Sequence, residues 1–182
     1  MASRSVLSID IGVKNFALCA IDLPAVVVRT LESWDLGDTK ALPTSAIVDR
    51  LLCCFHEWEF LHTWSPGLVL IEQQIRGAYV NLALAYSAYT YMKTRFPDAT
   101  VKFVAPMAKF KAYETHIELN DAEIDKKKKD KTSFSTYTKR KRLAVDIAEA
   151  VLSHMGQPCL STICPDVKKD DLADAFLQSF CC

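Results

Sequence analysis

Four acidic residues stand at positions from which strands and a helix could bring them together, although they are far apart along the chain of 182 residues. Asp10 ends one short apolar run, Glu72 ends another, and Asp171 and Asp174 lie three residues apart near the carboxyl end. If the two apolar runs form neighbouring strands, Asp10 and Glu72 emerge side by side at one edge of the sheet. Asp171 and Asp174 share one face of their predicted helix, so a helix packed across the sheet would complete the group.

Carboxylates gathered in this way repel one another, so they need cations to neutralise them. Mg²⁺, or Mn²⁺ in its place, is the natural partner of oxygen ligands. Two such ions about 3.5–4 Å apart activate a water molecule for attack on phosphorus and stabilise the leaving oxygen. The pattern therefore predicts a two-metal phosphodiesterase site whose metal ligands and catalytic residues are Asp10, Glu72, Asp171 and Asp174.

Each of these acids also has an ordinary structural explanation. An acid at the end of a strand is often a turn residue, and an Asp-x-x-Asp spacing often marks a solvated helix face. Asp174, however, stands between Ala173 and Ala175 in an apolar stretch, which indicates partial burial of a charge. Asp170 shares a helix face with Asp174 at a spacing of four, so the sequence leaves open whether Asp170 or Asp171 is the ligand.

The elements that would position these acids follow the order of a mixed α/β domain. Apolar and β-branched runs predict five strands, at residues 6–10, 16–21, 26–34, 68–72 and 101–104. Apolar residues at helical spacing predict four helices, at residues 43–62, 78–96, 137–155 and 169–180. The first three strands form an antiparallel meander, and strands then alternate with helices. We therefore expect one domain over residues 1–182, with a central mixed five-stranded sheet of meander and parallel strands flanked by helices.

Basic residues are concentrated in one part of the chain. The formal net charge is zero, yet residues 126–142 hold nine Lys or Arg residues and one acid, Asp130. The rest of the chain therefore carries a net negative charge. An acidic site beside a basic surface suits a metal-dependent enzyme that acts on a polyanion. The lysine-rich part, at about residues 120–135, has low hydrophobicity and is predicted to be a flexible insertion.

The seven cysteines indicate a reducing, cytosol-like compartment. Their number is odd, two pairs are adjacent, and no CxxC occurs, which is typical of free thiols and not of a disulfide framework. No apolar run approaches the roughly 18 residues of a membrane span, and no signal-peptide pattern opens the chain. We expect no membrane contact.

Three segments that contain the acids resemble the Holliday-junction resolvases of the RuvC superfamily, with most likeness to the poxvirus-type and fungal mitochondrial branches. They are SIDIGVKNFA at 8–17, IEQQ at 71–74 and KKDDLADAF at 168–176. The resemblance implies an RNase H-like fold and a homodimer that cuts four-way DNA junctions by paired symmetric nicks. It also implies that the four acids bind the metal ions and that no small-molecule cofactor takes part. Because the chain opens without a transit peptide, we expect a viral replication site rather than the mitochondrial matrix.

The resemblance further implies DNA contacts from residues around the site. Basic residues after the fifth strand and at the start of the following helix would contact phosphates near the scissile bond, so binding would weaken with salt. Gln73, Gln74 and Arg76, just beyond Glu72, are further candidates for contact with the junction. The expected DNA-binding residues are Lys109, Lys111, Lys139, Arg140, Lys141, Arg142, Gln73 and Arg76.

The helix after Glu72 is rich in tyrosine, including Tyr79, Tyr86 and Tyr89. These side chains belong either to the core or to a two-fold dimer face, which a symmetric substrate favours.

Other functions remain to be separated from junction resolution. A nuclease of the same fold could act on an RNA–DNA hybrid or on other branched DNA. Alternatively, the protein could bind junctions without cutting them, although the presence of all four acids speaks against a non-catalytic protein. An actin-like ATPase is a third possibility, because Asp-Ile-Gly after a strand can open a phosphate loop. That fold needs two such domains, and 182 residues are too few for them.

Overall fold

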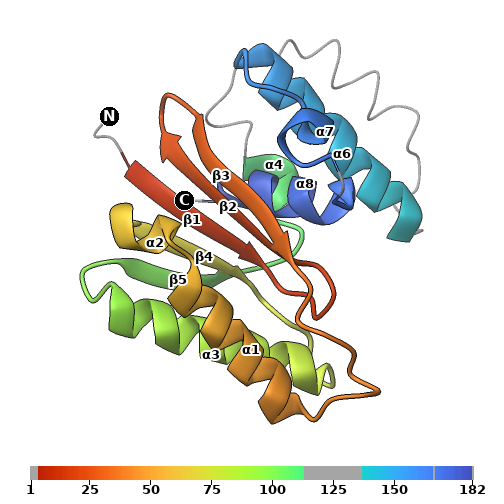
Figure 1. Cartoon of the computed structure of the whole chain (residues 1–182). Coiled ribbons are helices and arrows are strands. Elements are labelled where there is room, and N and C mark those ends of the chain that lie inside the picture. The colour runs from red at the N-terminus through yellow and green to blue at the C-terminus, as the bar shows by residue number, and fades with distance from the viewer. Residues whose placement is uncertain (1–3, 113–136, 166, 182) are drawn as a thin grey trace.

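A mixed five-stranded sheet forms the centre of the molecule (Figure 1). The computed structural model describes residues 4–112, 137–165 and 167–181. The sheet order is β3-β2-β1-β4-β5, and its strands are β1 (Arg4–Asp10), β2 (Phe16–Leu23), β3 (Val27–Trp34), β4 (Leu68–Glu72) and β5 (Thr100–Val104). The first three strands pair antiparallel, whereas β4 is parallel to both β1 and β5. The predicted meander with added parallel strands is therefore confirmed.

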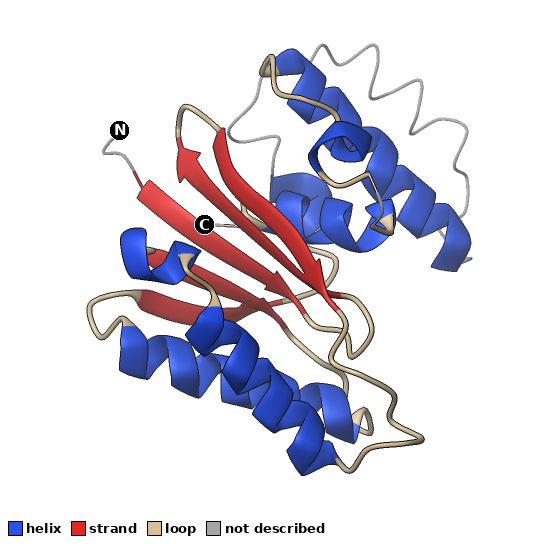
Figure 2. Ribbon diagram, in the orientation of Figure 1, coloured by secondary structure: helices blue, strands red, loops and turns tan. Residues whose placement is uncertain are grey.

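Helices cover both faces of this sheet (Figure 2). One face is covered by α1 (Thr44–Glu57), α2 (Phe60–Thr63) and α3 (Tyr79–Arg95). The other is covered by α4 (Lys109–Ala112), α6 (Tyr137–His154), α7 (Leu160–Ile163) and α8 (Lys169–Gln178). Because side chains alternate along a strand, β1 sends Leu7 and Ile9 into the first layer and Val6 into the second, and each layer buries its own apolar cluster.

The prediction of one helix over residues 43–62 was wrong. Helix α1 ends at Glu57, and a separate turn of helix, α2, follows at Phe60–Thr63. Trp58 lies between them with an extended backbone (φ −71°, ψ 94°), and its indole N–H donates a 2.8 Å hydrogen bond to Glu32 of β3. This contact spans 26 residues of sequence, so local spacing could not reveal the break.

Two predictions from composition concern cysteines and membranes. The six cysteines of the described ranges are free, as the sequence predicted, and Cys182 lies outside those ranges. No helix in the described part of the chain has the length and apolar character needed to cross a membrane. The lysine-rich stretch at about residues 120–135 lies outside the described residues.

Candidate active site

The first two predicted carboxylates emerge from neighbouring strands. Ile9 of β1 is the register partner of Ile71 of β4, and the two strands are parallel. Asp10 and Glu72 are the next residues along each strand, so both leave the sheet at the same edge. Apolar neighbours in the layer formed by α1, α2 and α3 hold these strand ends in place, because Ile9 and Ile71 are fully buried there.

Helix α8 crosses this edge of the sheet and carries the other two carboxylates. Its buried Gln178 fixes the crossing, because the side-chain amide donates hydrogen bonds to the carbonyl oxygens of Ile9 (3.0 Å) and Leu70 (3.1 Å). One side chain therefore ties the helix to both strands just before their acids. Leu172 and Phe176 are fully buried against the sheet, which leaves Asp171 and Asp174 at the sheet edge.

A tight turn after β1 shapes one wall of the site. A Cβ atom on Gly12 would lie 2.7 Å from the carbonyl oxygen of Asn15, so a larger residue would force the turn to open. The turn brings Lys14 and Asn15 back to the pocket that Asp10 lines.

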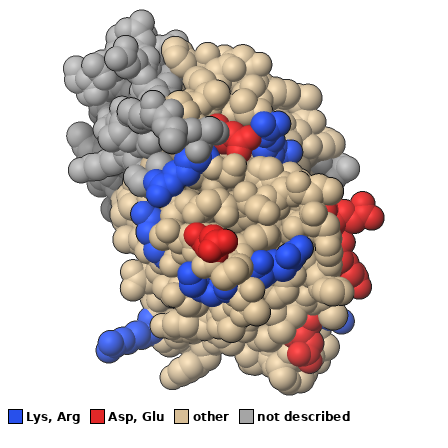
Figure 3. Space-filling model, turned by 90° about the vertical axis from the view of Figure 1, so that its left-hand side faces the viewer, with Lys and Arg blue, Asp and Glu red and all other residues tan. Residues whose placement is uncertain are grey.

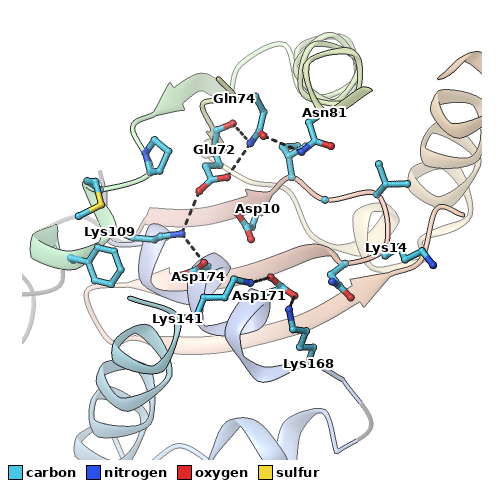
Figure 4. A pocket seen from close by; sticks show the side chains of 17 residues that line it. Asp10, Lys14, Glu72, Gln74, Asn81, Lys109, Lys141, Lys168, Asp171 and Asp174 are labelled. Carbon is cyan, nitrogen blue, oxygen red and sulfur yellow. Dashed lines mark hydrogen bonds and ion pairs between the residues drawn. The ribbon is translucent and has the colours of Figure 1, made fainter. Parts of the chain in front are cut away.

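The four predicted acids line one and the same pocket (Figure 4). Asp10 comes from β1, Glu72 from β4, and Asp171 and Asp174 from α8. Asp10 and Asp171 are each 7% exposed, so their carboxylates are largely removed from water. The structure therefore brings together all four side chains that sequence spacing had grouped.

Lysine ammonium groups lie between these carboxylates. Lys109 of α4 is 5% exposed, and its Nζ lies 3.0 Å from Asp174 Oδ2 and 3.4 Å from Glu72 Oε1. Lys141 of α6 lies 2.7 Å from Asp171 Oδ1. The pocket is thus an interleaved cluster of acids and lysines drawn from β1, β4, α4, α6 and α8.

The structure also separates Asp170 from Asp171. Asp171 lines the pocket with the other three acids, whereas Asp170 is not among the lining residues. The Asp170 carboxylate pairs with Lys141 (2.7 Å) and Lys168 (3.1 Å), the two lysines that Asp171 also faces. Burial raises the pKa of Asp170, but its hydrogen bonds to these two lysines outweigh that effect and lower the pKa below its ordinary value. Asp171 is therefore the better candidate ligand.

Two of the acids hold protons more tightly than usual. Burial raises the pKa of Asp10 well above its ordinary value, and the negative charges of Glu72 and Asp174 raise it further, against the lowering effect of Lys109. Burial also raises the pKa of Asp174, although Lys109 partly offsets this. Lys109 shows the converse effect: burial lowers its pKa, but the surrounding carboxylates raise the pKa above its ordinary value.

These shifts predict how the stability of the metal-free protein depends on pH. Because the folded state binds protons at Asp10 and Asp174 more tightly than the unfolded chain, their contribution to the free energy of unfolding falls as pH rises from about 4 through the raised pKa values. Asp10→Asn removes one of the two groups, so its melting temperature at pH 8 in EDTA should exceed that of the wild type by at least about 2 °C. Thermal melts between pH 5 and 8 test this, and equal slopes for both proteins would contradict it.

The side chains present suit a hard divalent cation in their chemistry. Carboxylate oxygens are the ligands that Mg²⁺ and Mn²⁺ prefer, and the buried Oδ2 of Asp171 accepts no hydrogen bond and lies 3.6 Å from Lys168 Nζ. Within the described residues, however, no three Asp, Glu, His or Cys side chains are grouped as ligands around one point. The carboxylates surround ammonium groups instead, so the metal-ligand set remains a prediction.

The predicted DNA-binding residues are placed in different surroundings. Lys109 and Lys141 lie inside the pocket and pair with its acids. Gln73, Arg76 and Arg142 are exposed and do not line the pocket. The side chains of Lys111, Lys139 and Arg140 lie outside the described part of the structure. DNA contact by any of the eight stays a prediction.

Sequence reasoning missed two polar residues of the site, Asn81 and Lys168. Asn81 lines the pocket beside Gln74, which was expected only to contact the junction, and Lys168 lies beside Asp171 (Figure 4). Asn81 carried a usable signal, because it is a polar residue between Val80 and Leu82 at the start of an apolar helical stretch. An amide in such a position has its donors and acceptors to satisfy.

One face of the molecule away from the pocket is mixed in charge. This face, at the left-hand side of Figure 1, includes the amino-terminal end of β1, and on it a few Lys and Arg side chains and a few Asp and Glu side chains are separated by uncharged surface (Figure 3). The described residues form no continuous basic surface on this face.

The fold and the arrangement of the acids define the class of domain: a meander sheet with parallel strands, crossed by a carboxyl-terminal acidic helix, is an RNase H-like domain.

No protein-family model matches the chain, and no curated protein matches it significantly. Solved structures of resolvases match it over nearly the whole length. RuvC from Thermus thermophilus, in complex with Holliday junction substrate, has a TM-score of 0.63 at 16% identity and covers 98% of this chain and 91% of its own. The Fowlpox virus resolvase, in complex with substrate Holliday junction DNA, has a TM-score of 0.62 at 16% identity and covers 96% of this chain and 93% of its own. These matches establish the fold.

Proposed function

We propose that the protein is a Holliday-junction resolvase, a metal-dependent endonuclease that cuts four-way DNA junctions by paired symmetric nicks. The observation that carries this proposal is the convergence of Asp10, Glu72, Asp171 and Asp174 on one pocket. The fold supports it, since two resolvases that share this fold were solved with Holliday junction DNA.

We infer that these four carboxylates would hold two Mg²⁺ ions, with Mn²⁺ able to substitute. Bound divalent ions at such a site activate water and stabilise the charge that develops on the phosphate. The chain's own contribution is to hold the carboxylates in fixed positions: Gln178 ties α8 to β1 and β4, and the buried strand ends prevent the acids from turning away. Burial also excludes water that would weaken the electrostatic interactions in the pocket.

The pocket lysines suit a polyanionic substrate. The lining includes as many lysines as carboxylates: Lys14, Lys109, Lys141 and Lys168 against the four acids. Ammonium groups that neutralise carboxylates here are also positioned to bind a DNA phosphate once divalent cations take over that neutralisation. The site therefore combines metal ligands with phosphate donors at one edge of the sheet.

A substrate panel tests the proposed function directly. The purified protein is incubated with Mg²⁺ and end-labelled substrates at equal ionic strength: a mobile four-way junction, the matched linear duplex, and an RNA–DNA hybrid. We expect two symmetric nicked duplexes from the junction, little product from the duplex, and no product in EDTA. Preference for the hybrid would favour an RNA-cleaving relative, and junction binding without cleavage in both Mg²⁺ and Mn²⁺ would favour a non-catalytic binding protein.

A homodimer fits the two-fold symmetry of the proposed substrate. Helix α3 carries two exposed tyrosines, Tyr79 (80% exposed) and Tyr86 (61% exposed). Tyr86 also lines a shallow groove with Leu52 of α1 and Tyr91 of α3. Exposed aromatic side chains beside a groove are typical of the centre of protein interfaces, so we place the dimer contact on the outer face of α3.

Tyr86→Asp should weaken this dimer. A carboxylate at the centre of an apolar contact would be desolvated without a partner, so we expect the dissociation constant of the dimer to rise at least about tenfold. Sedimentation velocity over a range of protein concentrations measures the change. Tyr86→Phe, which keeps the ring and its contact with Phe103, is the matched control. If Tyr86→Asp dimerises as well as Tyr86→Phe, the contact lies elsewhere.

A further inference from the structure

A chain of side-chain hydrogen bonds runs from the first turn of α3 to the carboxylate of Glu72 (Figure 4). Asn81 Nδ2 donates to Gln74 Oε1 (3.3 Å). Gln74 Nε2 in turn donates to Glu72 Oε2 (3.0 Å) and to the Glu72 carbonyl oxygen (3.3 Å). The other carboxylate oxygen, Oε1, faces Lys109 at 3.4 Å. The two oxygens of Glu72 are therefore held from opposite sides.

We propose that Asn81 and Gln74 are positioning residues that fix the orientation of the Glu72 carboxylate, with Asn81 acting only through Gln74. This inference rests on the proposed function, because it assigns to these amides a role in the reaction to which Glu72 contributes. Neither residue is expected to touch the reacting phosphate. Their task is to keep Glu72 Oε1 directed to the centre of the pocket.

The chemistry of the amides shows what Asn81 contributes. A glutamine side chain can rotate by 180° and exchange its oxygen with its nitrogen, which reverses its hydrogen bonding. If Gln74 were reversed, its oxygen would face the Glu72 carboxylate and the two would repel each other, so the carboxylate itself favours the orientation with Nε2 toward it. In that orientation Gln74 Oε1 is free to accept, and Asn81 Nδ2 donates to it. Asn81 thus stabilises the orientation of Gln74 from α3.

Replacing Asn81 by aspartate removes this donor and adds a competing acceptor. A carboxylate at position 81 accepts hydrogen bonds but donates none, so it would repel Gln74 Oε1 and compete with Glu72 for Gln74 Nε2. The negative charge also lies in the first turn of a helix, where it stabilises the helix. A loss of activity in Asn81→Asp would therefore not reflect unfolding of α3.

The kinetic test is a double-mutant cycle with Gln74→Met, which keeps the length of the side chain and removes its hydrogen bonds. We expect Asn81→Asp to lower single-turnover cleavage of the junction in Mg²⁺ by about 10- to 100-fold, as is usual for residues that orient metal ligands. In the Gln74→Met background the same change should cost less than about threefold, while junction affinity in EDTA stays within about twofold. Gln157→Glu, which makes the same change from amide to acid outside the pocket, should behave as the wild type.

A spectroscopic test stands apart from catalysis. The side-chain amide resonances of Gln74, assigned by their loss in Gln74→Met, should shift in Asn81→Asp and in Glu72→Gln and stay in place in Gln157→Glu. If these resonances respond to neither change, the hydrogen-bonded chain is absent and the inference is overturned. If they respond but the cycle is additive, Asn81 does not act through Gln74, which also overturns it. If the wild type cuts no junction, the proposed function is refuted instead. The amide resonances alone would then decide whether the hydrogen bonds from Asn81 through Gln74 to Glu72 are present or absent.

Discussion

Asp10→Asn should bind the four-way junction like the wild type and cut it about 10³-fold more slowly, a loss of roughly 4 kcal/mol in transition-state stabilisation. The substitution preserves the shape of a side chain that is 7% exposed, so packing around β1 should not change. It replaces the carboxylate of a proposed metal ligand by a neutral amide within the acidic cluster. Because Asp10 is largely buried, solvent would do little to screen the change in charge that the substitution causes.

The design separates catalysis from folding and from binding. Junction affinity is measured by gel shift in EDTA, and cleavage by single-turnover kinetics in Mg²⁺. The matched control is Asp98→Asn, because Asp98 is an exposed carboxylate in the loop between α3 and β5, outside the pocket. If Asp10→Asn cuts at the rate of Asp98→Asn, Asp10 is not a catalytic residue and the two-metal assignment is wrong.

The position of the four acids could be predicted because simple geometry determines it. Asp10 and Glu72 end parallel neighbours, so one edge of the sheet had to receive both. Asp171 and Asp174 share a helix face, and their apolar neighbours Leu172 and Phe176 indicate which side of the helix packs on the sheet. The acids at the strand ends and the spacing on the helix are local properties of the sequence, whereas the pairing of β1 with β4 is not local and entered the prediction only as a condition.

The lysine pairs could not be predicted in the same way. Lys109 was expected to contact DNA after the fifth strand, yet in the structure its side chain turns inward to Glu72 and Asp174. Its partners are 37 and 65 residues away along the chain, and nothing in the spacing of lysines reveals which of them is drawn into an acidic cluster. The hydrogen bond to Glu32 from Trp58, the residue that follows α1, was hidden for the same reason.

The pairing of Lys109 with the acids has a consequence for metal binding. A buried cation among carboxylates lowers their mutual repulsion, so the fold tolerates the acids before any divalent ion arrives. The same cation competes with that ion for Glu72 and Asp174. Lys109 should therefore stabilise the metal-free protein strongly and the metal-bound protein much less.

Lys109→Met tests this dual role and should be among the most destabilising single changes in the molecule. Methionine fills a similar volume but leaves Asp10, Glu72 and Asp174 without their shared counter-charge, and breaking a buried pair in this way costs about 3–5 kcal/mol. For a domain of this size, this corresponds to a fall of roughly 10 °C in melting temperature in EDTA. Because the pKa of Lys109 is raised, the wild-type stabilisation is fully present throughout the neutral range, and it is lost as pH rises from about 10.5, the ordinary lysine value, through the raised pKa.

Divalent cations should reverse much of this loss. Because Mn²⁺ would replace the missing positive charge, the gain in melting temperature on adding Mn²⁺ should be larger for Lys109→Met than for the wild type. Cleavage by Lys109→Met should nevertheless stay about 10²-fold slower, because the variant lacks the ammonium group proposed to contact the phosphate. Lys102→Met, at an exposed position on β5, is the matched control and should follow the wild type in both buffers. Equal melting temperatures of Lys109→Met and Lys102→Met in EDTA would show that the acids do not depend on Lys109. An Mn²⁺ response no larger than that of the wild type would show that the ammonium group and the metal ion do not share a site.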